Sequence, residues 1–191
     1  MHGARMWHTL RLYTMRNAFK RTQYFKDNDI FHSMGDDCLI TDRVVPLYSK
    51  LISLGNNVHL ASGVHFVTHD VTHSMLNRSD KALSFSKGKK YSEKVGCIDI
   101  GDNVFIGSGT YITYNVKIGS NVIIGACSLV NKDVPDNCVV AGVPAKVIKS
   151  FDVFLEKRSQ DEAVDRLKGE RLSPDTVMRM WAQFYEERKK K

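Results

Sequence analysis

A repeat of six residues runs through the second half of the chain and limits what it can fold into. From Ile100 onward the sequence divides into IGDNVF, IGSGTY, ITYNVK, IGSNVI, IGACSL and VNKDVP. An aliphatic residue opens every block, and a small or β-branched residue stands at the fifth position. An α-helix of period 3.6 cannot hold a six-residue repeat on one face, and a plain strand alternates with period two. The repeat therefore predicts a coil with three short flat sides, in which the first position points inward.

The same register recurs upstream, less regularly. It returns as LGNNVH, LASGVH and FVTHDV from Leu54, and more loosely as MGDDCL and ITDRVV from Met34. Three sides of six residues would complete one rung, and rungs would stack at the strand spacing of roughly 4.8 Å. We therefore expect about four rungs between residues 34 and 150. The stretch from Pro46 to Ser53 is two residues too long for the repeat, so a bulge or corner belongs there.

Three segments leave the repeat domain of residues 34–150. A polar, aperiodic loop covers residues 72–99, and a loop of this length inside a compact domain is usually functional or disordered. Residues 1–33 should form an N-terminal helical cap. Residues 151–191 should form a C-terminal helical extension, whose last helix has Ser173 as its N-cap.

The N-terminal segment is basic. All six of its cations precede the first acid, Asp27, and the net charge of the chain is +7. Met6, Leu10 and Tyr13 lie at helical spacing in this segment. Peripheral contact with anionic lipid is one expectation. The other is a helix that caps the first rung and buries its apolar face there. We expect no nucleic-acid partner.

Cysteine usage indicates a reducing compartment. Four cysteines show no C-x-x-C pair and no disulfide-like framework, at Cys38, Cys97, Cys127 and Cys138. No run of eighteen apolar residues occurs, and the first residues lack the apolar core of a signal peptide. We therefore expect a cytoplasmic protein of one domain with appendages.

The most specific stretch is Ile100–Ile148, which reads IGDNVFIGSG, then VKIGSNVIIGACSLVNKDVPDNCVVAGVPAKVI. It resembles the hexapeptide-repeat acetyltransferases, in the branch of galactoside, maltose and polysaccharide O-acetyltransferases. The resemblance implies a mainly β fold, a left-handed parallel β-helix with N- and C-terminal helices. It also implies a homotrimer that transfers an acetyl group directly from acetyl-coenzyme A, without a metal. The acceptor would be a sugar hydroxyl of a polysaccharide or its precursor.

Three histidines four residues apart, His65, His69 and His73, raise two interpretations. On a helix they could bind zinc, but the six-residue register argues against a helix there. The resemblance makes His69 the catalytic general base and places Asp70 beside it in the substrate site. Imidazole suits proton removal from a hydroxyl, since its ordinary pKa is about 6.5. Asp42, one rung below, could also hold a sugar hydroxyl or merely form a corner.

The resemblance also implies that coenzyme A lies in a groove between two subunits. Its arm would pair with coil backbone and its phosphates would lie near basic residues, which implicates Phe105, Ser108, Ala126, Asn131, Lys132 and Lys146. Three alternatives stay open. They are N-acetylation of an amino sugar, often nucleotide-linked, zinc-dependent hydration at a site shared between subunits as in gamma-class carbonic anhydrases, and a non-catalytic β-helix scaffold.

Overall fold

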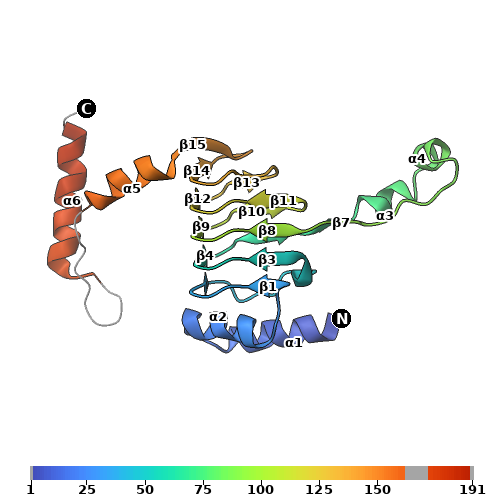
Figure 1. Cartoon of the computed structure of the whole chain (residues 1–191), viewed down its shortest axis with the longest axis horizontal. Helices are drawn as coiled ribbons and strands as arrows, with labels where there is room; N and C mark the ends of the chain where they lie inside the picture. The colour runs from blue at the N-terminus through green and yellow to red at the C-terminus, as the bar shows by residue number, and fades with distance from the viewer. Residues whose placement is uncertain (1, 162–171, 190–191) are drawn as a thin grey trace. The chain divides into compact units, whose positions relative to one another are not determined.

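The computed structural model describes residues 2–161 and 172–189. Its fold is mainly β, with short strands stacked in layers and helices before and after them (Figure 1). One sheet holds β1 (Ser33–Met34), β3 (Ile52–Leu54), β8 (Ile98–Ile100) and β11 (Val116–Ile118). The next holds β2 (Leu39–Ile40), β4 (Val58–Leu60), β9 (Val104–Ile106), β12 (Val122–Ile124), β14 (Cys138–Ala141) and β15 (Lys146–Ser150). The third holds β5 (His65–Val67), β10 (Tyr111–Thr113) and β13 (Leu129–Val130).

The helices lie outside these sheets. They are α1 (His2–Tyr13), α2 (Ala18–Asp27), the 3₁₀ turn η1 (Ser49–Leu51), α3 (Thr72–Leu76), α4 (Asp80–Phe85), α5 (Phe151–Ser159) and α6 (Pro174–Lys189). A separate two-stranded ribbon joins β6 (His69–Asp70) to β7 (Lys94–Val95). None of the helices in the described residues has the length and apolarity needed to cross a membrane.

The chain winds from sheet to sheet in a fixed order. From β8 it passes to β9 in the second sheet, to β10 in the third, and back to the first with β11. The strands of the coil pair in parallel, apart from the antiparallel β14–β15 pair. Between residues 98 and 130, residues that pair between successive coils, such as Val104 and Val122, are 18 positions apart. Three sides of six residues make one coil, so the predicted register is confirmed.

The inward positions of the repeat form the core. Side chains that open the six blocks are 0% to 2% exposed, at Ile100, Ile106, Ile112, Ile118, Ile124 and Val130. Those at the fifth positions are 0% to 7% exposed, at Val104, Thr110, Val116, Val122, Ser128 and Val134. Each coil therefore stacks its apolar side chains on those of the next, and this burial drives the fold.

Asparagines fill one column of corners. Asn57, Asn103, Asn121 and Asn137 all have φ between 54° and 57°, a left-handed conformation that asparagine tolerates better than most residues. Their side-chain amides form a ladder along the coil, with N···O distances of 2.9, 3.1 and 2.9 Å. The ladder holds the corners of these four coils in register.

The register slips in the first coil. In the block ITDRVV the first residue, Ile40, is buried as expected, but Val44 at the fifth position is 46% exposed, whereas Val45 is 3% exposed. The cause is the docking of α1, because Val45 donates its N–H to Thr9 Oγ1 and accepts a hydrogen bond from Arg5 Nε. The predicted irregularity after Pro46 is confirmed, since η1 lies there.

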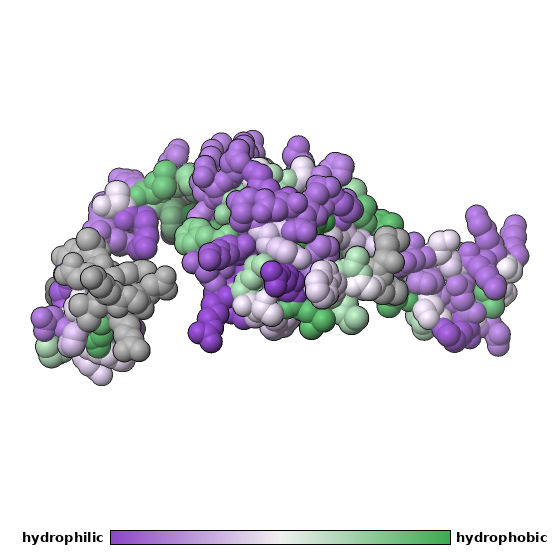
Figure 2. All heavy atoms as spheres, turned by 90° about the horizontal axis from the view of Figure 1, so that it is seen from below, coloured by the Kyte–Doolittle hydropathy of each residue, from purple (hydrophilic) through white to green (hydrophobic). Residues whose placement is uncertain are grey.

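The two N-terminal helices cover the first coil. Leu12 and Phe25 are buried against it, and Arg21 donates to the backbone oxygens of Met15, Arg16 and Thr41. The expected burial of Met6, Leu10 and Tyr13 in this cap is wrong, because these side chains are 55% to 64% exposed. The helix turns its Leu12 side inward, so its most apolar stripe faces outward. Figure 2 views this side of the molecule and shows green and pale spheres among the hydrophilic ones.

The C-terminal segment belongs mostly to a separate compact unit. One unit ends at Phe154 and the other begins at Leu155, close to the expected boundary after residue 150. In the second unit Ser173 Oγ accepts the N–H of Thr176 at 3.1 Å, so the predicted N-cap of α6 is confirmed.

Candidate active site

The two places where the chain leaves the six-residue repeat meet at His69. Tyr48, in the irregular stretch before β3, packs the edge of its ring against the imidazole of His69, with centroids 5.3 Å apart and planes at 89°. The Tyr48 hydroxyl donates to Glu93, 3.1 Å away, just before the chain returns to the coil. His69 itself lies on β6, opposite Val95 of β7. Segments distant in sequence are thus joined around one imidazole.

The backbone around His69 is fixed on its N-terminal side, and its imidazole is partly buried. Thr68 before it is fully buried, and its hydroxyl donates to Leu47 O at 2.8 Å. Nδ1 of His69 is buried and has no hydrogen-bond partner within the described residues. Nε2 is therefore the ring nitrogen available to a ligand. A half-buried imidazole with one free nitrogen can act as a general base.

Tyr48 is strained into place. Its φ is 51°, in the left-handed region that bulky side chains avoid. Its hydrogen bond to Glu93 raises the pKa of Tyr48 above the ordinary value, so the phenol stays protonated and remains a donor. Strained backbone of this kind persists where surrounding contacts enforce it, which is common at functional sites.

Asp70 is fixed as a carboxylate next to His69. One oxygen accepts from the hydroxyl and N–H of Thr72 at 2.6 and 3.0 Å, and the other accepts from the Tyr114 hydroxyl at 2.9 Å. The Thr72 hydroxyl, then its N–H, then Tyr114 hold the pKa of Asp70 below its ordinary value. Lys94 Nζ lies 5.2 Å from the Tyr114 ring centroid. Asp70 thus ties the outgoing chain to the coil.

Asp42 has both oxygens engaged by backbone. Oδ1 accepts from Gly63 N at 2.9 Å and Oδ2 from Val64 N at 3.1 Å. These contacts favour the corner role over the sugar-binding one. A role for Asp42 in binding substrate stays a prediction.

The other two histidines of the series lie on different elements from His69. His65 is exposed on β5 and stacks on Tyr111 at 4.5 Å, while His73 lies on α3. The helix that would align all three is absent, since residues 65–67 are a strand. Among the described residues, no group of three or more His, Cys, Asp or Glu side chains could hold a metal ion.

The residues expected to bind coenzyme A lie along the coil surface. Phe105 is 46% exposed on β9, in line with His59 and Ile123 of the neighbouring coils. Ser108 and Ala126 stand at stacked corners, where Cys127 N donates to Ser108 O at 2.8 Å. The remaining three are also exposed, at Asn131, Lys132 and Lys146. In the part of the chain described, none of the six hydrogen-bonds to His69.

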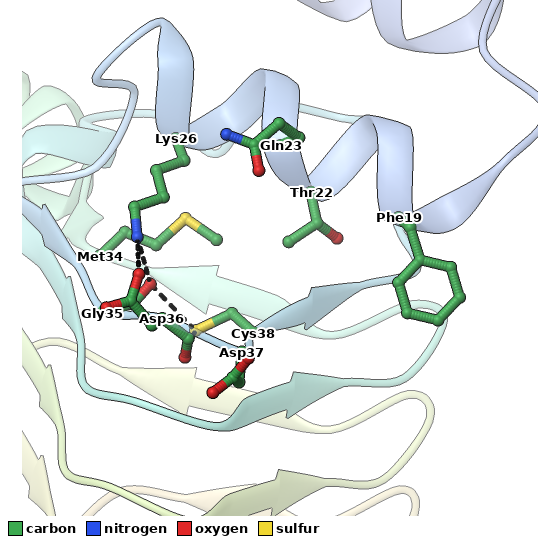
Figure 3. A pocket seen from close by; sticks show the side chains of 9 residues that line it. All are labelled: Phe19, Thr22, Gln23, Lys26, Met34, Gly35, Asp36, Asp37 and Cys38. Carbon is green, nitrogen blue, oxygen red and sulfur yellow. Dashed lines mark hydrogen bonds and ion pairs between the residues drawn. The ribbon is translucent and has the colours of Figure 1, made fainter.

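A hollow of about 400 Å³ lies elsewhere, between α2 and the first coil. Figure 3 shows Lys26 reaching from α2 to Asp36, with which it forms an ion pair. This pair holds the pKa of Asp36 below its ordinary value. The hollow contains none of the predicted site residues, so we do not assign it to the chemistry at His69.

Sequence reasoning missed Tyr48, Glu93 and Tyr114 as neighbours of the site. A signal existed for Tyr48 alone, because it lies in the stretch that is too long for the repeat. Glu93 lies 45 residues from Tyr48 in the sequence, and Tyr114 lies 44 residues from Asp70. Nothing in the local sequence pattern indicates that either residue contacts the site.

Comparison with known proteins places this geometry in a family. The family model "Bacterial transferase hexapeptide (six repeats)" matches residues 98–132. Protein CapG of Staphylococcus aureus is 42% identical over 127 residues, which are 65% of this chain and 69% of CapG. Galactoside O-acetyltransferase of Escherichia coli strain K12 is 39% identical over 102 residues, 53% of this chain but only 45% of the relative.

A solved structure agrees with these sequence matches. The maltose O-acetyltransferase from Clostridium difficile 630 has a TM-score of 0.53 and 28% identity, covering 78% of this chain and 84% of that one. The six-residue register agrees with the matching family model. The chain therefore belongs to the hexapeptide-repeat acetyltransferases.

Proposed function

We propose that this protein is an acetyl-coenzyme A-dependent O-acetyltransferase whose acceptor is a sugar hydroxyl of a polysaccharide or its precursor. The observation that carries the proposal is the meeting of both repeat interruptions at His69. Relatives named galactoside and maltose O-acetyltransferase support the reaction and a sugar acceptor. We also propose that the coil winds in the left-handed sense.

In this mechanism Nε2 of His69 takes the proton of the sugar hydroxyl as its oxygen attacks the thioester carbonyl. A tetrahedral oxyanion forms, and a backbone N–H of a coil corner is suited to stabilise it. Collapse of this intermediate breaks the carbon–sulfur bond, and the imidazolium returns the proton to the leaving thiolate. The products are an acetyl ester and free coenzyme A. Tyr48 packs against the His69 ring, and Asp70 anchors the backbone that follows it through Thr72 and Tyr114.

In this proposal acetyl-coenzyme A, the acetyl donor, binds in a groove between two chains of a homotrimer. Phe105, one of the expected coenzyme A residues, and Tyr111 are large apolar side chains exposed on the coil surface. One side of a coil is flat, and a neighbouring chain would make it concave enough to hold a ligand. Lys132 and Lys146 would then lie near the phosphates.

Release of free thiol from acetyl-coenzyme A tests the function. The intact chain is incubated with neutral sugars, amino sugars and nucleotide-linked sugars, and thiol is measured against a blank without acceptor. Acceptor-dependent release with hydroxyl sugars supports the proposal. Release with amino sugars alone would favour N-acetylation, and no release with any acceptor would favour a scaffold.

Tyr48→Ala should lower kcat about tenfold and leave KM for acetyl-coenzyme A unchanged. The ring edge restrains the His69 imidazole, and a displacement of about 1 Å can cost up to 10²-fold in rate. Tyr48→Phe is the matched control, because it keeps the ring and loses only the Glu93 hydrogen bond. Steady-state measurement of kcat and KM for both variants shows whether the ring or the hydroxyl of Tyr48 is needed. An equal loss in Tyr48→Phe would assign the effect to the hydroxyl instead.

A cytoplasmic location fits the four cysteines, all of which are free thiols. We also propose that α1 contacts the anionic face of a membrane. Its outward side carries Met6, Trp7, Leu10 and Tyr13, each 55% to 65% exposed. Exposed cations lie on and after the helix, at Arg11, Arg16 and Lys20. Aromatic and aliphatic side chains flanked by cations are typical of helices that lie in a lipid interface.

The protein should float with vesicles that contain anionic lipid at low salt, and about 0.5 M salt should release it because charges are then screened. Trp7→Ser combined with Leu10→Ser should weaken this binding by at least about tenfold, since each buried apolar side chain contributes about 1.5 kcal/mol or more. Phe85→Ser, which removes an apolar side chain that is 89% exposed on α4, serves as control. Failure of the unaltered protein to float would make α1 a cap only.

A further inference from the structure

The loop that leaves the coil at His69 is an ordered arm with a hollow of its own. The arm comprises residues 72–95, and Figure 1 shows its helices α3 and α4 standing away from the coil beyond β7. The hollow measures about 380 Å³ and is lined by His73, Ser74, Asn77, Arg78 and Lys90. Two of these side chains are cations and a third is a histidine, while none is an acid.

The walls of the hollow are fixed by hydrogen bonds. Asn77 donates its side-chain N–H to Tyr91 O and accepts the Tyr91 N–H, both at 2.8 Å. The Tyr91 hydroxyl donates to Ala82 O at 3.1 Å. These bonds hold the returning chain beside Lys90 against the end of α3. The hollow is therefore built from tethered segments of the arm.

The positive charge of the hollow is not neutralised by any carboxylate in the described residues. Arg78 forms hydrogen bonds with the backbone oxygen and hydroxyl of Ser74, and in the described residues neither Arg78 nor Lys90 forms an ion pair with a carboxylate. Nδ1 of His73 is buried and has no hydrogen-bond partner there. The Arg78 guanidinium and the Lys90 ammonium are the kinds of donor that bind phosphate oxygens.

The arm is basic as a whole. Its six cations outnumber its two acids, Asp80 and Glu93. It is also joined to the catalytic region, because Thr72 at its start bonds to Asp70, and Glu93 at its end accepts from Tyr48. A ligand bound to the arm would therefore be held by a segment whose two ends are hydrogen-bonded to the neighbours of His69.

We infer that the hollow binds a phosphate of the acceptor, so that the acetylated sugar is one attached to a diphosphate. This inference rests on the proposed acetyltransferase function. A neutral sugar offers these donors only uncharged oxygen acceptors, whereas a diphosphate-linked sugar presents both a hydroxyl for His69 and an anion for Arg78 and Lys90. The diphosphate can be joined to a nucleoside or to a lipid, and both sources share this chemistry.

Direct binding tests the inference independently of the transferase reaction. Titration calorimetry of the full chain with inorganic pyrophosphate, at about 0.15 M salt to screen weak contacts, should show binding. Arg78→Gln should raise Kd at least about tenfold, and Arg78→Lys should recover part of the affinity. Lys81→Gln is the matched control, because it removes an arm cation outside the hollow. No binding by the unaltered chain, or an equal loss in the control, would overturn the inference.

Two further measurements identify the group that carries the diphosphate and test whether the hollow binds acetyl-coenzyme A instead of the acceptor. Binding of a nucleoside diphosphate such as UDP would indicate a nucleotide-linked sugar, and binding only to vesicles that contain a polyisoprenyl diphosphate would indicate a lipid-linked one. Arg78→Gln should raise KM for a diphosphate-linked acceptor about tenfold and leave KM for acetyl-coenzyme A unchanged. A rise in KM for acetyl-coenzyme A alone would assign the hollow to the donor and overturn the inference. Pyrophosphate binding without any transferase activity would contradict the proposed function but leave the anion site standing.

Discussion

His69→Ala lowers kcat by about 10² to 10⁴, the contribution of a positioned general base to a reaction of this kind. The loss follows from removal of the one imidazole at which the interruptions of the coil meet. KM for acetyl-coenzyme A should change little, because the donor is expected to bind along the coil surface. Steady-state thiol release measures both constants.

His32→Ala is the matched control for this variant. His32 is exposed beside β1, where its backbone N–H donates to Ile52 O, and its side chain has no hydrogen bond in the described residues. Its replacement should leave kcat within about twofold of the unaltered protein, as surface substitutions usually leave the fold intact. Near-normal activity of His69→Ala would remove His69 from the mechanism.

Ile118→Ala should lower the free energy of unfolding by about 2 to 5 kcal/mol, the usual cost of removing a buried isoleucine side chain. Ile118 is 0% exposed on β11, pairs with Ile100 below it and bridges to Val134 above it. A cavity at this point interrupts the apolar column along the coil. Urea unfolding at a fixed chain concentration measures the change.

Lys117→Ala, one residue earlier on the same strand, controls for the substitution itself. The Lys117 side chain is 71% exposed and lies 3.9 Å from Asp99, an ion pair of little energetic weight. Its loss should cost less than about 1 kcal/mol. Equal destabilisation by the two substitutions would contradict the inward placement of the first position in each repeat.

The coil could be predicted from the sequence because one repeat specifies both its sides and its core. Each block from Ile100 onward buries its first and fifth side chains, as a fixed six-residue register requires. Prediction failed where tertiary contacts override the register. Docking of α1 through Arg5 and Thr9 shifts the inward position from Val44 to Val45. The same docking turns Leu12 inward and leaves the Met6 stripe outside.

The candidate site could be predicted only in part. The histidine just before the loop marks His69, and its neighbour Asp70 follows in sequence. The side chains that contact them, Tyr48 and Tyr114, come from other coils, and no local pattern encodes which residues a winding chain brings together. The hydrogen bonds of Asp42 to Gly63 and Val64 likewise depend on the stacking of one coil on the next.

The mass and lability of the acetylated acceptor test the central claim most directly. The unaltered chain is incubated with acetyl-coenzyme A and the acceptor that gives the most thiol release, and the acceptor is analysed before and after mild alkali. O-acetyl transfer at the His69 site predicts a gain of one acetyl group that alkali removes, and no such gain with His69→Ala. An alkali-stable acetyl group, or free acetate with an unchanged acceptor, would contradict it.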